Sequence, residues 1–519
     1  MSAPARGRHA THVGAGIFVS RLTGLARDVA VAAFLGTRLT ADAYWAAIKI
    51  PNIIRNLLGE GTLSAAFVPV YSEQLKRVRE GEDPPRLASS VLGLVLIVAT
   101  LLSGLGVLLA PWITAILLGG ADESTRVLTT SLVRILFPMS GFLILGAWCL
   151  GVLNSHDRFF LPFVAPALWN LSQVAGLLIA AQMGADSLAH ALAWSALVGG
   201  VIQVGVQIPA ALRLSQVRRP TLDFSWEPMR RVARNTLPVI SSQGIFQISS
   251  LVDLALASLA GTSALAALGY SQRLLYLPIS LFGISVAAAA LPAMSRETAS
   301  AALRERLVNG FFQITFFVLP AAVVLLLFGD LAVRIVYERG EFTRESTLLV
   351  SAVLSAYSLG LVAMSSMKLF ASGFHALQDT RTPMRIAAIS VGVGVVVSVS
   401  LTLAMKAADY GPYSAIGLAL GGATGAWLNL LLHWWLLSRR IGGLFDTDML
   451  RATVRLCVAA LVAAATSSIA RTVLEPSLGD GSFVMAVVLL GAILLAGGAP
   501  YLLIARRPPR FAVLAPTDD

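Results

Sequence analysis

The sequence is poor in charge and in cysteine. Only 13% of its 519 residues are Asp, Glu, Lys or Arg, whereas soluble proteins carry about 25%. Its two cysteines, Cys149 and Cys457, both lie in apolar stretches and provide neither a disulfide framework nor a zinc pattern. The six histidines are scattered, so we expect no metal site, and the absence of a GxxxxGK[ST] loop argues against ATP-driven chemistry. We expect no cofactor.

Long apolar runs are what the sequence has instead. Hydrophobic residues make up 56% of the chain, and its mean hydropathy is +0.77. A helix needs about 20 mostly apolar residues to cross a bilayer. Such windows predict an all-α polytopic membrane protein with about fourteen transmembrane helices. Their centres lie near residues 24, 49, 102, 138, 172, 199, 247, 281, 317, 358, 393, 424, 462 and 493.

The net charge of +11 is unevenly distributed among the predicted loops. Arginine and lysine concentrate in alternate loops, at 76–86, 213–234, 296–306 and 439–455, and in the C-terminal tail. The intervening loops near 120, 184, 262 and 408 have almost none, and only the loop at 329–345 departs from this pattern. The positive-inside rule therefore predicts both termini in the cytoplasm. The basic residues point to membrane topology rather than to nucleic acid.

Three pairs of similar segments indicate an internal duplication. LARDVAVAAFLGT at 25–37 resembles SLVDLALASLAGT at 250–262, and AAFVPVYSE at 65–73 resembles AAALPAMSR at 288–296. In nearly the same register, LNSHDRFFLP at 153–162 pairs with HALQDTRTP, which ends at residue 383. Because six spans return the chain to its starting side, we predict two homologous six-helix lobes of like orientation around a central cavity, with two additional C-terminal helices.

These considerations divide the chain into four parts. We predict an N-lobe at 1–212, a cytoplasmic amphipathic linker at 213–234 and a C-lobe at 235–440. The remaining part, 441–519, holds the two extra transmembrane helices and a short cytoplasmic tail.

The first predicted helix carries charges at membrane depth. Arg21 and Asp28 are seven residues apart and share one face, Arg27 lies on a neighbouring face, and Gly24 leaves room for close approach of another group. A charged side chain at the bilayer centre costs roughly 3 kcal/mol on insertion scales, so these arginines need a compensating partner. An anionic substrate in a hydrated cavity is the simplest one.

The second predicted span repeats this pattern. Asp42, Lys49, Asn52 and Arg55 follow a polar stripe, and Pro51 is expected to kink the helix. In the second lobe, Arg273 precedes a proline in the eighth span. A planar guanidinium binds phosphate oxygens in bidentate fashion, so several converging arginines would suit a diphosphate.

Each of these residues also has a structural interpretation. A single arginine near a helix end usually extends its guanidinium to the headgroups, and Arg55 is the most open to this reading. Asp253 can bind a coupling cation or pair with an arginine, and Lys368 can join an intramolecular ion pair. We expect Asp379 and Thr380 to cap a helix.

Several strings together resemble a known family. SRLTGLARD at 20–28 and ADAYWAAIKIPNIIRNLLGEGTLSAAFVPVYSE at 41–73 are similar to the amino-terminal signature of the MurJ/MviN-type lipid II flippases of the MOP exporter superfamily. GVLNSHDRFFLP at 151–162, YSQRLLYLPISLFGISVAAAALP at 270–292 and FHALQDTRTP at 374–383 extend the resemblance. It covers about residues 12–505.

The resemblance implies a flippase in the bacterial cytoplasmic membrane that moves an undecaprenyl-diphosphate-linked peptidoglycan precursor to the outer leaflet. In the family, the cavity arginines that hold the diphosphate match Arg21, Arg27, Arg55 and Arg273, and their acidic neighbours match Asp28, Asp42 and Glu60. From its place in the polar stripe of the second span, we add Asn52 to the predicted substrate-binding residues. The last two helices form a groove for the lipid tail. Family members differ in whether sodium or the membrane potential drives transport, and Asp253 and Lys368 are the candidates for ion coupling.

The sequence leaves three other functions open. A flippase for another polyprenyl-linked glycan would have similar chemistry, because nothing in the spacing reads the sugar. A cation-coupled multidrug exporter would require a cavity rich in carboxylates and aromatics, whereas the deep charges here are mainly arginines. A transport-inactive scaffold would use the charges only as intramolecular pairs. The sequence leaves the oligomeric state open.

Overall fold

A computed structural model of the chain describes residues 3–78, 81–184, 187–294, 300–444, 447–478 and 483–505. These residues form helices joined by turns and short loops, and no strand occurs among them. The prediction of an all-α protein is confirmed. The chain divides into two compact units, Met1–Ala266 with Arg339–Phe342, and Ala267–Glu338 with Thr343–Asp519.

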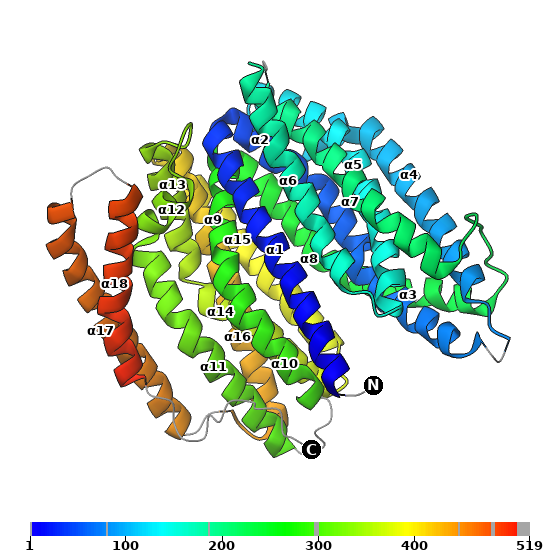
Figure 1. Cartoon of the computed structure of the whole chain (residues 1–519). Helices are drawn as coiled ribbons and strands as arrows, with labels where there is room; N and C mark the ends of the chain where they lie inside the picture. The colour runs from blue at the N-terminus through cyan, green and yellow to red at the C-terminus, as the bar shows by residue number, and fades with distance from the viewer. Residues whose placement is uncertain are drawn as a thin grey trace. The chain divides into compact units, whose positions relative to one another are not determined.

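The first unit is built around α5, which packs against α2, α3, α4 and α7, while α6 packs against α1 and α7. Figure 1 shows α4, α5 and α7 side by side. Its helices are α1 (Ala3–Leu35), α2 (Leu39–Leu58), α3 (Glu60–Lys76), α4 (Pro84–Leu117), α5 (Glu123–Ser155), α6 (Phe160–Gln182), α7 (Leu188–Ser215) and α8 (Glu227–Leu259).

The second unit begins within α9 and includes the C-terminal pair α17 and α18, which pack against each other (Figure 1). Its helices are α9 (Ala264–Pro278), the π-helix η2 (Ile279–Ile284), α10 (Ser285–Met294), α11 (Ser300–Leu327), α12 (Gly329–Tyr337), α13 (Arg344–Ser358), α14 (Leu361–Ala376), α15 (Arg381–Ala407), the 3-10 turn η3 (Gly411–Ser414), α16 (Ala415–Ile441), α17 (Thr447–Leu478) and α18 (Phe483–Ile504).

Ten spans among the described residues are long and apolar enough to cross a membrane. An eleventh follows if α13 and α14, which meet at a bend of 44°, form one span. All fourteen predicted centres lie in helices. The count of fourteen remains a prediction, because the charge-bearing helices α1, α2 and α8 are not among the ten.

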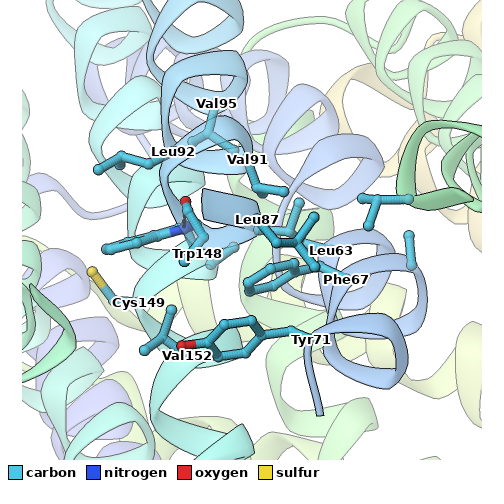
Figure 2. Packing of buried hydrophobic residues seen from close by; sticks show 14 of the residues in the cluster. Leu63, Phe67, Tyr71, Leu87, Val91, Leu92, Val95, Trp148, Cys149 and Val152 are labelled. Carbon is cyan, nitrogen blue, oxygen red and sulfur yellow. Dashed lines mark hydrogen bonds between the residues drawn. The ribbon is translucent and has the colours of Figure 1, made fainter. Parts of the chain in front are cut away.

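An aromatic core lies where α3, α4 and α5 meet (Figure 2). Phe67 and Tyr71 of α3 stack with ring centroids 4.9 Å apart and pack with Trp148 of α5. The Trp148 indole N–H donates to the carbonyl of Ala88 in α4 at 3.1 Å, so its one polar atom is satisfied. This cluster fixes the end of the unit from which the α7–α8 connection departs.

Small residues bring α15 and α16 together. Gly417, Gly421 and Gly425 recur every four residues on α16, where added Cβ atoms would meet Ser390, Gly394, Ser398 or Thr402 of α15. Four-residue spacing keeps them on one helix face. The hydrophobic effect does not drive helices together inside a bilayer, because lipid tails are as apolar as the side chains. Van der Waals contact between closely approaching backbones therefore stabilises the pair.

Paired backbone turns support the duplication inferred from sequence. Asp157 after α5 and Gln378 after α14 both adopt left-handed φ, 59° and 58°. In both turns the next amide donates back five residues, Arg158 to Leu153 and Asp379 to Phe374, each at 2.9 Å. Glycines of positive φ likewise follow α1 and α8. The repeated strings therefore occupy equivalent turns.

The turn Arg339–Phe342 belongs to the first unit although its flanking helices α12 and α13 belong to the second. The Glu341 amide donates to the Ala33 carbonyl at 2.8 Å, and Arg38 pairs with the Glu341 carboxylate at 2.6 Å. Gly36 and Gly340 both have positive φ, and an added Cβ on either would strike the opposing backbone. Backbone therefore packs directly on backbone at the end of α1.

The first compact unit extends through α8 to Ala266, beyond the predicted N-lobe boundary at 212. Within the predicted linker 213–234, α7 continues to Ser215 and α8 begins at Glu227, so only Gln216–Trp226 is irregular. Compact packing does not define a homologous repeat. The lobe boundaries therefore remain predictions.

Candidate functional site

Arg27 is buried in the last third of α1, with 6% of its surface exposed. Its Nε and Nη2 atoms donate to Asp28 Oδ1 at 3.1 and 2.7 Å. Nη1 donates to Asn170 Oδ1 of α6 at 3.0 Å, and the guanidinium carbon lies 5.0 Å from the centroid of the Trp169 ring. A carboxylate, an amide and an aromatic face thus surround one cation.

Asn170 joins α6 to α1. Its Nδ2 atom donates to the Ser20 carbonyl at 3.1 Å and to Thr23 Oγ1 at 3.2 Å. A Cβ on Gly24 would lie 3.5 Å from the same amide nitrogen. The prediction that Gly24 leaves room for another group is confirmed, and the group is Asn170.

The Arg27 charge is therefore compensated inside the protein by Asp28, which is itself buried. A buried charge is costly when unpaired, so removing one partner of such a pair typically costs about 3–5 kcal/mol. The compensating partner expected from sequence was an anionic substrate. A bound diphosphate would have to share the guanidinium with Asp28 or displace it.

Asp42 is 1% exposed at the start of α2. Its two carboxylate oxygens accept the backbone amides of Ser263 and Ala266, at 2.5 and 2.7 Å. These amides lie at the beginning of α9, where helical N–H groups lack intrahelical partners. In this structure Asp42 caps a helix, a structural role in addition to the predicted one near the substrate.

The remaining stripe on α2 is half-buried. Lys49 interacts electrostatically with Asp253 of α8, and Arg55 lies six residues further along α2. The Asn52 Oδ1 atom is buried and has no hydrogen-bond partner among the described residues. An orphaned buried acceptor of this kind calls for a further donor, such as water or a ligand. The side chain of Glu60 lies outside the described residues.

Four other predicted residues are exposed well inside their helices: Arg21, Asp253, Arg273 and Lys368. Arg273 is on the third turn of α9, before Pro278 and the π-helix η2, in a span of 27 residues. A charge exposed to hydrocarbon at such depth is strongly disfavoured, so it normally faces water or a polar partner. Exposure in mid-span is thus the property expected of cavity-lining charges.

The structure brings together some predicted site residues. Arg27 joins Asp28, and Lys49 approaches Asp253, all within the first unit. Arg273 and Lys368 belong to the second unit. Convergence of guanidinium groups from both halves on one cavity remains a prediction.

Sequence reasoning missed Trp169 and Asn170 in α6. Two amide side chains in a mostly apolar segment, Asn170 and Gln173, could have indicated a buried polar contact there. Both are buried, and Gln173 Oε1 accepts the Tyr44 hydroxyl of α2 at 2.8 Å. Three-residue spacing on a helix places them on one face, so α6 presents a polar edge to α1 and α2.

An apolar cavity of about 460 Å³ lies within the second unit. Helices α9, α11, α12, α17 and α18 and the π-helix contribute its walls. Among its lining residues are Leu281, Pro320, Val336, Ala463, Leu490 and Leu494. A cavity of this composition suits a hydrocarbon chain rather than a polar group.

Comparisons with known proteins agree along nearly the whole chain. A family model described as lipid II flippase MurJ matches residues 31–489. A probable lipid II flippase MurJ of Rhizobium tropici is 33% identical, with 95% of this chain and 92% of the relative covered. The lipid II flippase MurJ of Burkholderia cenocepacia is 31% identical, with 86% of each chain covered.

Solved structures share the fold. The inward closed conformation of a lipid II flippase MurJ matches with a TM-score of 0.76 and 24% identity, covering 95% of this chain and 97% of its own. An inward-facing multidrug resistance MATE family transporter of the MOP superfamily matches with a TM-score of 0.65 and 16% identity, covering 82% and 95%. At these identities the likeness concerns architecture alone.

Proposed function

This chain belongs to the lipid II flippase MurJ family, and from that membership we propose that it moves lipid II, a polyprenyl-diphosphate-linked peptidoglycan precursor, from the inner to the outer leaflet of the bacterial cytoplasmic membrane. The observation that carries the proposal is the family match over residues 31–489. The family is one of transporters, and the chain is a multi-pass helical membrane protein. Its role is therefore translocation rather than catalysis.

We assign the diphosphate to the arginines Arg21, Arg27, Arg55 and Arg273. Arg21 and Arg273 are exposed in mid-helix, which leaves them accessible to an anion. Arg27 is held by Asp28 and Asn170, so its guanidinium is oriented before substrate arrives. Preorganised donors of this kind lose less entropy when they bind an anion.

The polyprenyl tail fits the apolar cavity beside the last two helices. Its walls include Leu490 and Leu494 of α18 and Ala463 of α17. The family resemblance leads us to expect the tail at these helices. A volume of about 460 Å³ accommodates several isoprene units, and the rest of a long tail would extend into lipid.

Transport follows from alternating access. A ligand shifts an equilibrium between inward-open and outward-open states only through its different affinity for the two. Neutralisation of these arginines by a diphosphate would favour closure on the cytoplasmic side, and release outside would reset the cycle. The membrane potential or a monovalent cation would drive it, with Asp253 and Lys368 as the charges that respond.

Complementation tests the proposal. A bacterial cell depleted of its own lipid II flippase is supplied with this chain, and lipid II headgroups accessible at the outer surface are measured. Arg27→Ala and Arg273→Ala should abolish transport at unchanged membrane abundance, whereas Arg344→Ala, at the exposed start of α13, should retain it. Normal transport by both site variants would overturn the assignment of the diphosphate.

A second, more conservative variant at Arg27 distinguishes loss of transport from loss of folding, because Arg27→Ala would leave the buried Asp28 carboxylate unpaired. Arg27→Lys keeps the charge but removes the bidentate geometry. We expect it to insert normally and to transport poorly. If Arg27→Lys transports as well as the wild type, positive charge alone is sufficient, and the oriented guanidinium is not needed.

The MATE-like architecture favours one rival, a cation-coupled multidrug exporter. Direct binding separates the two. Purified protein should bind an undecaprenyl diphosphate lipid, with affinity reduced in Arg273→Ala, and cationic drugs should not compete. Competition by a cationic drug would favour the exporter, and equal binding of a different polyprenyl-linked glycan would broaden the substrate class.

A further inference from the structure

The connection between α7 and α8, Gln216–Trp226, is irregular in backbone yet firmly held on α4. The Thr221 amide donates to the Ser89 carbonyl at 3.2 Å, and the Thr221 hydroxyl lies 3.0 Å from Ser89 Oγ. Ser89 Oγ also donates to the Arg219 carbonyl. Gly93 allows the closest approach, because a Cβ there would collide with the Thr221 carbonyl oxygen.

A second set of contacts fixes the far end of this connection. Arg86 donates through Nε to Asp223 Oδ2 at 2.9 Å and lies over the Trp226 ring at 4.9 Å. Asp223 Oδ1 accepts the Ser225 amide at 3.1 Å. Val217 and Trp226 pack against the aromatic core of the unit. The backbone of the connection is therefore fixed at both ends.

Two large apolar side chains nevertheless point outward. Leu222 is 52% exposed and Phe224 is 44% exposed, although the residues between and beside them are tied down. Exposed arginines flank them: Arg218, Arg219 and Arg230. The Arg230 Nε atom donates to the Phe224 carbonyl at 2.8 Å, which holds this arginine beside the apolar pair.

The depth of the connection follows from α4. This helix of 34 residues is about 50 Å long, whereas the hydrocarbon core is about 30 Å thick, so roughly 10 Å extends beyond it at each end. Gly93 lies roughly 14 Å from Pro84 along the helix axis. Thr221 packs on Gly93, so Leu222 and Phe224 lie near the boundary between headgroups and acyl chains.

We propose that the α7–α8 connection is an interfacial anchor that inserts Leu222 and Phe224 among the acyl chains and binds anionic phospholipid headgroups through Arg218 and Arg219. Apolar side chains with flanking arginines are the composition that seats a segment in the headgroup layer. The charge is complementary to anionic lipid. The positive-inside expectation makes this the cytoplasmic leaflet.

Spin-label depth measurements test the insertion. The full-length protein with Cys457→Ser retains only the buried Cys149, which is shielded from labelling. Single labels are placed at Leu222→Cys and Phe224→Cys in nanodiscs of phosphatidylcholine and phosphatidylglycerol in equal parts. Leu101→Cys on the exposed face of α4 is the acyl-chain reference, and Ser124→Cys at the start of α5 is the water reference.

The expected result is that both connection labels are relaxed more by oxygen and less by a water-soluble nickel chelate than the label at Ser124→Cys, with values between the two references. Nickel accessibility equal to that at Ser124→Cys would overturn the insertion and would instead indicate a surface for a soluble partner.

Lipid retention tests the headgroup preference. The wild type and the Arg218→Gln/Arg219→Gln variant are extracted from the same mixed bilayers, and bound phosphatidylglycerol is compared with bound phosphatidylcholine. We expect the preference for phosphatidylglycerol to fall by about fivefold for each arginine removed. Arg344→Gln, which removes an exposed positive charge elsewhere, should leave it unchanged. An unchanged preference in the double variant would overturn anionic lipid as the ligand.

Discussion

Arg27 illustrates what a sequence indicates about one residue and what it does not. Its depth and the space beside Gly24 could be inferred from helical spacing. The pairing with Asp28 could not, because adjacent residues on a helix do not normally face each other, and a long arginine side chain must fold back to make the contact. The hydrogen bond from Arg27 to Asn170 could not be predicted for a different reason: the two residues are 143 positions apart in the sequence.

Gly36 is a residue whose replacement should destabilise the protein. Its φ is +60°, and an added Cβ would lie 2.5 Å from the Glu341 carbonyl oxygen. Left-handed φ alone costs a non-glycine residue about 1 kcal/mol or more, and the collision adds to this. Gly36→Ala should therefore lower the thermal unfolding midpoint of the purified protein. Gly104→Ala is the matched control, because its Cβ would meet nothing within 4 Å, and it should be neutral or stabilising. Equal midpoints for the two variants would contradict the packing described.

His156 should make stability depend on pH. It follows α5 and lies 3.2 Å from the Tyr71 hydroxyl, and burial lowers its pKa from the ordinary value of 6.5. The unfolded chain then binds a proton at a higher pH than the folded chain, so stability is full above about pH 6.5 and falls as the pH drops below it. Unfolding midpoints measured at about pH 7.5 and about pH 5.5 should differ more for wild type than for His156→Gln. Identical pH dependence in the two proteins would show that this histidine does not contribute.

At the scale of elements, helix positions were predictable because apolar length is what a bilayer demands. The tenth predicted centre, near 358, falls at the end of α13, just before the 44° bend to α14. Hydropathy alone does not predict this bend, because the segments before and after it form one continuous apolar window. The predicted cap is confirmed for Asp379, whose Oδ1 accepts the amides of Arg381 and Thr382 at 3.0 and 2.9 Å. The side chain of Thr380, the other predicted cap, makes no capping hydrogen bond. Hydrogen bonds from Thr382 and Arg440 hold the pKa of Asp379 well below its usual range.

The contact between α15 and α16 should tolerate no added volume at its centre. A Cβ on Gly421 would lie 2.5 Å from the Ser398 backbone nitrogen and 2.7 Å from the Gly394 carbonyl oxygen. Overpacking of this kind typically costs about 1–3 kcal/mol. Gly421→Ala should lower the thermal midpoint in detergent, whereas Gly392→Ala on the open side of α15, with no neighbour within 4 Å, should not. A stable Gly421→Ala protein would mean that the two helices can separate at little expense.

At the scale of the whole molecule, the internal duplication could be predicted from the sequence, because two homologous halves need similar residues at their equivalent turns. Asp157 and Gln378 occur at matching places in their strings and share one backbone conformation. The extent of the first compact unit could not be predicted, because α8 packs against α2, α3 and α4, which are far from it in the sequence. The candidate site could be predicted only in part. The polar stripe on α2 follows from residue spacing, but the capping role of Asp42 depends on where α9 begins, which the sequence does not show.

The energy source for the proposed transport is a property of the entire protein. We expect dependence on the membrane potential rather than on sodium, because span 385–404 offers no Asn or Asp to complete a cation site with Asp253. Moving one charge through 100 mV is worth about 2.3 kcal/mol, enough to bias a cycle. Dissipating the potential with valinomycin and potassium should lower the outward movement of lipid II, and replacing sodium by choline should not. Sodium dependence with indifference to the potential would reverse this assignment and point to Asp253 as a ligand.

The Arg339–Phe342 turn has a consequence for how the protein can be dissected. The chain passes between its compact units at Ala266–Ala267, at Glu338–Arg339 and at Phe342–Thr343. A gene split after codon 266 would yield an amino-terminal fragment lacking four residues of its own fold, which its partner polypeptide would have to donate. Co-expressed fragments should consequently associate and copurify through this donated peptide, and the amino-terminal fragment made alone should be the less soluble species.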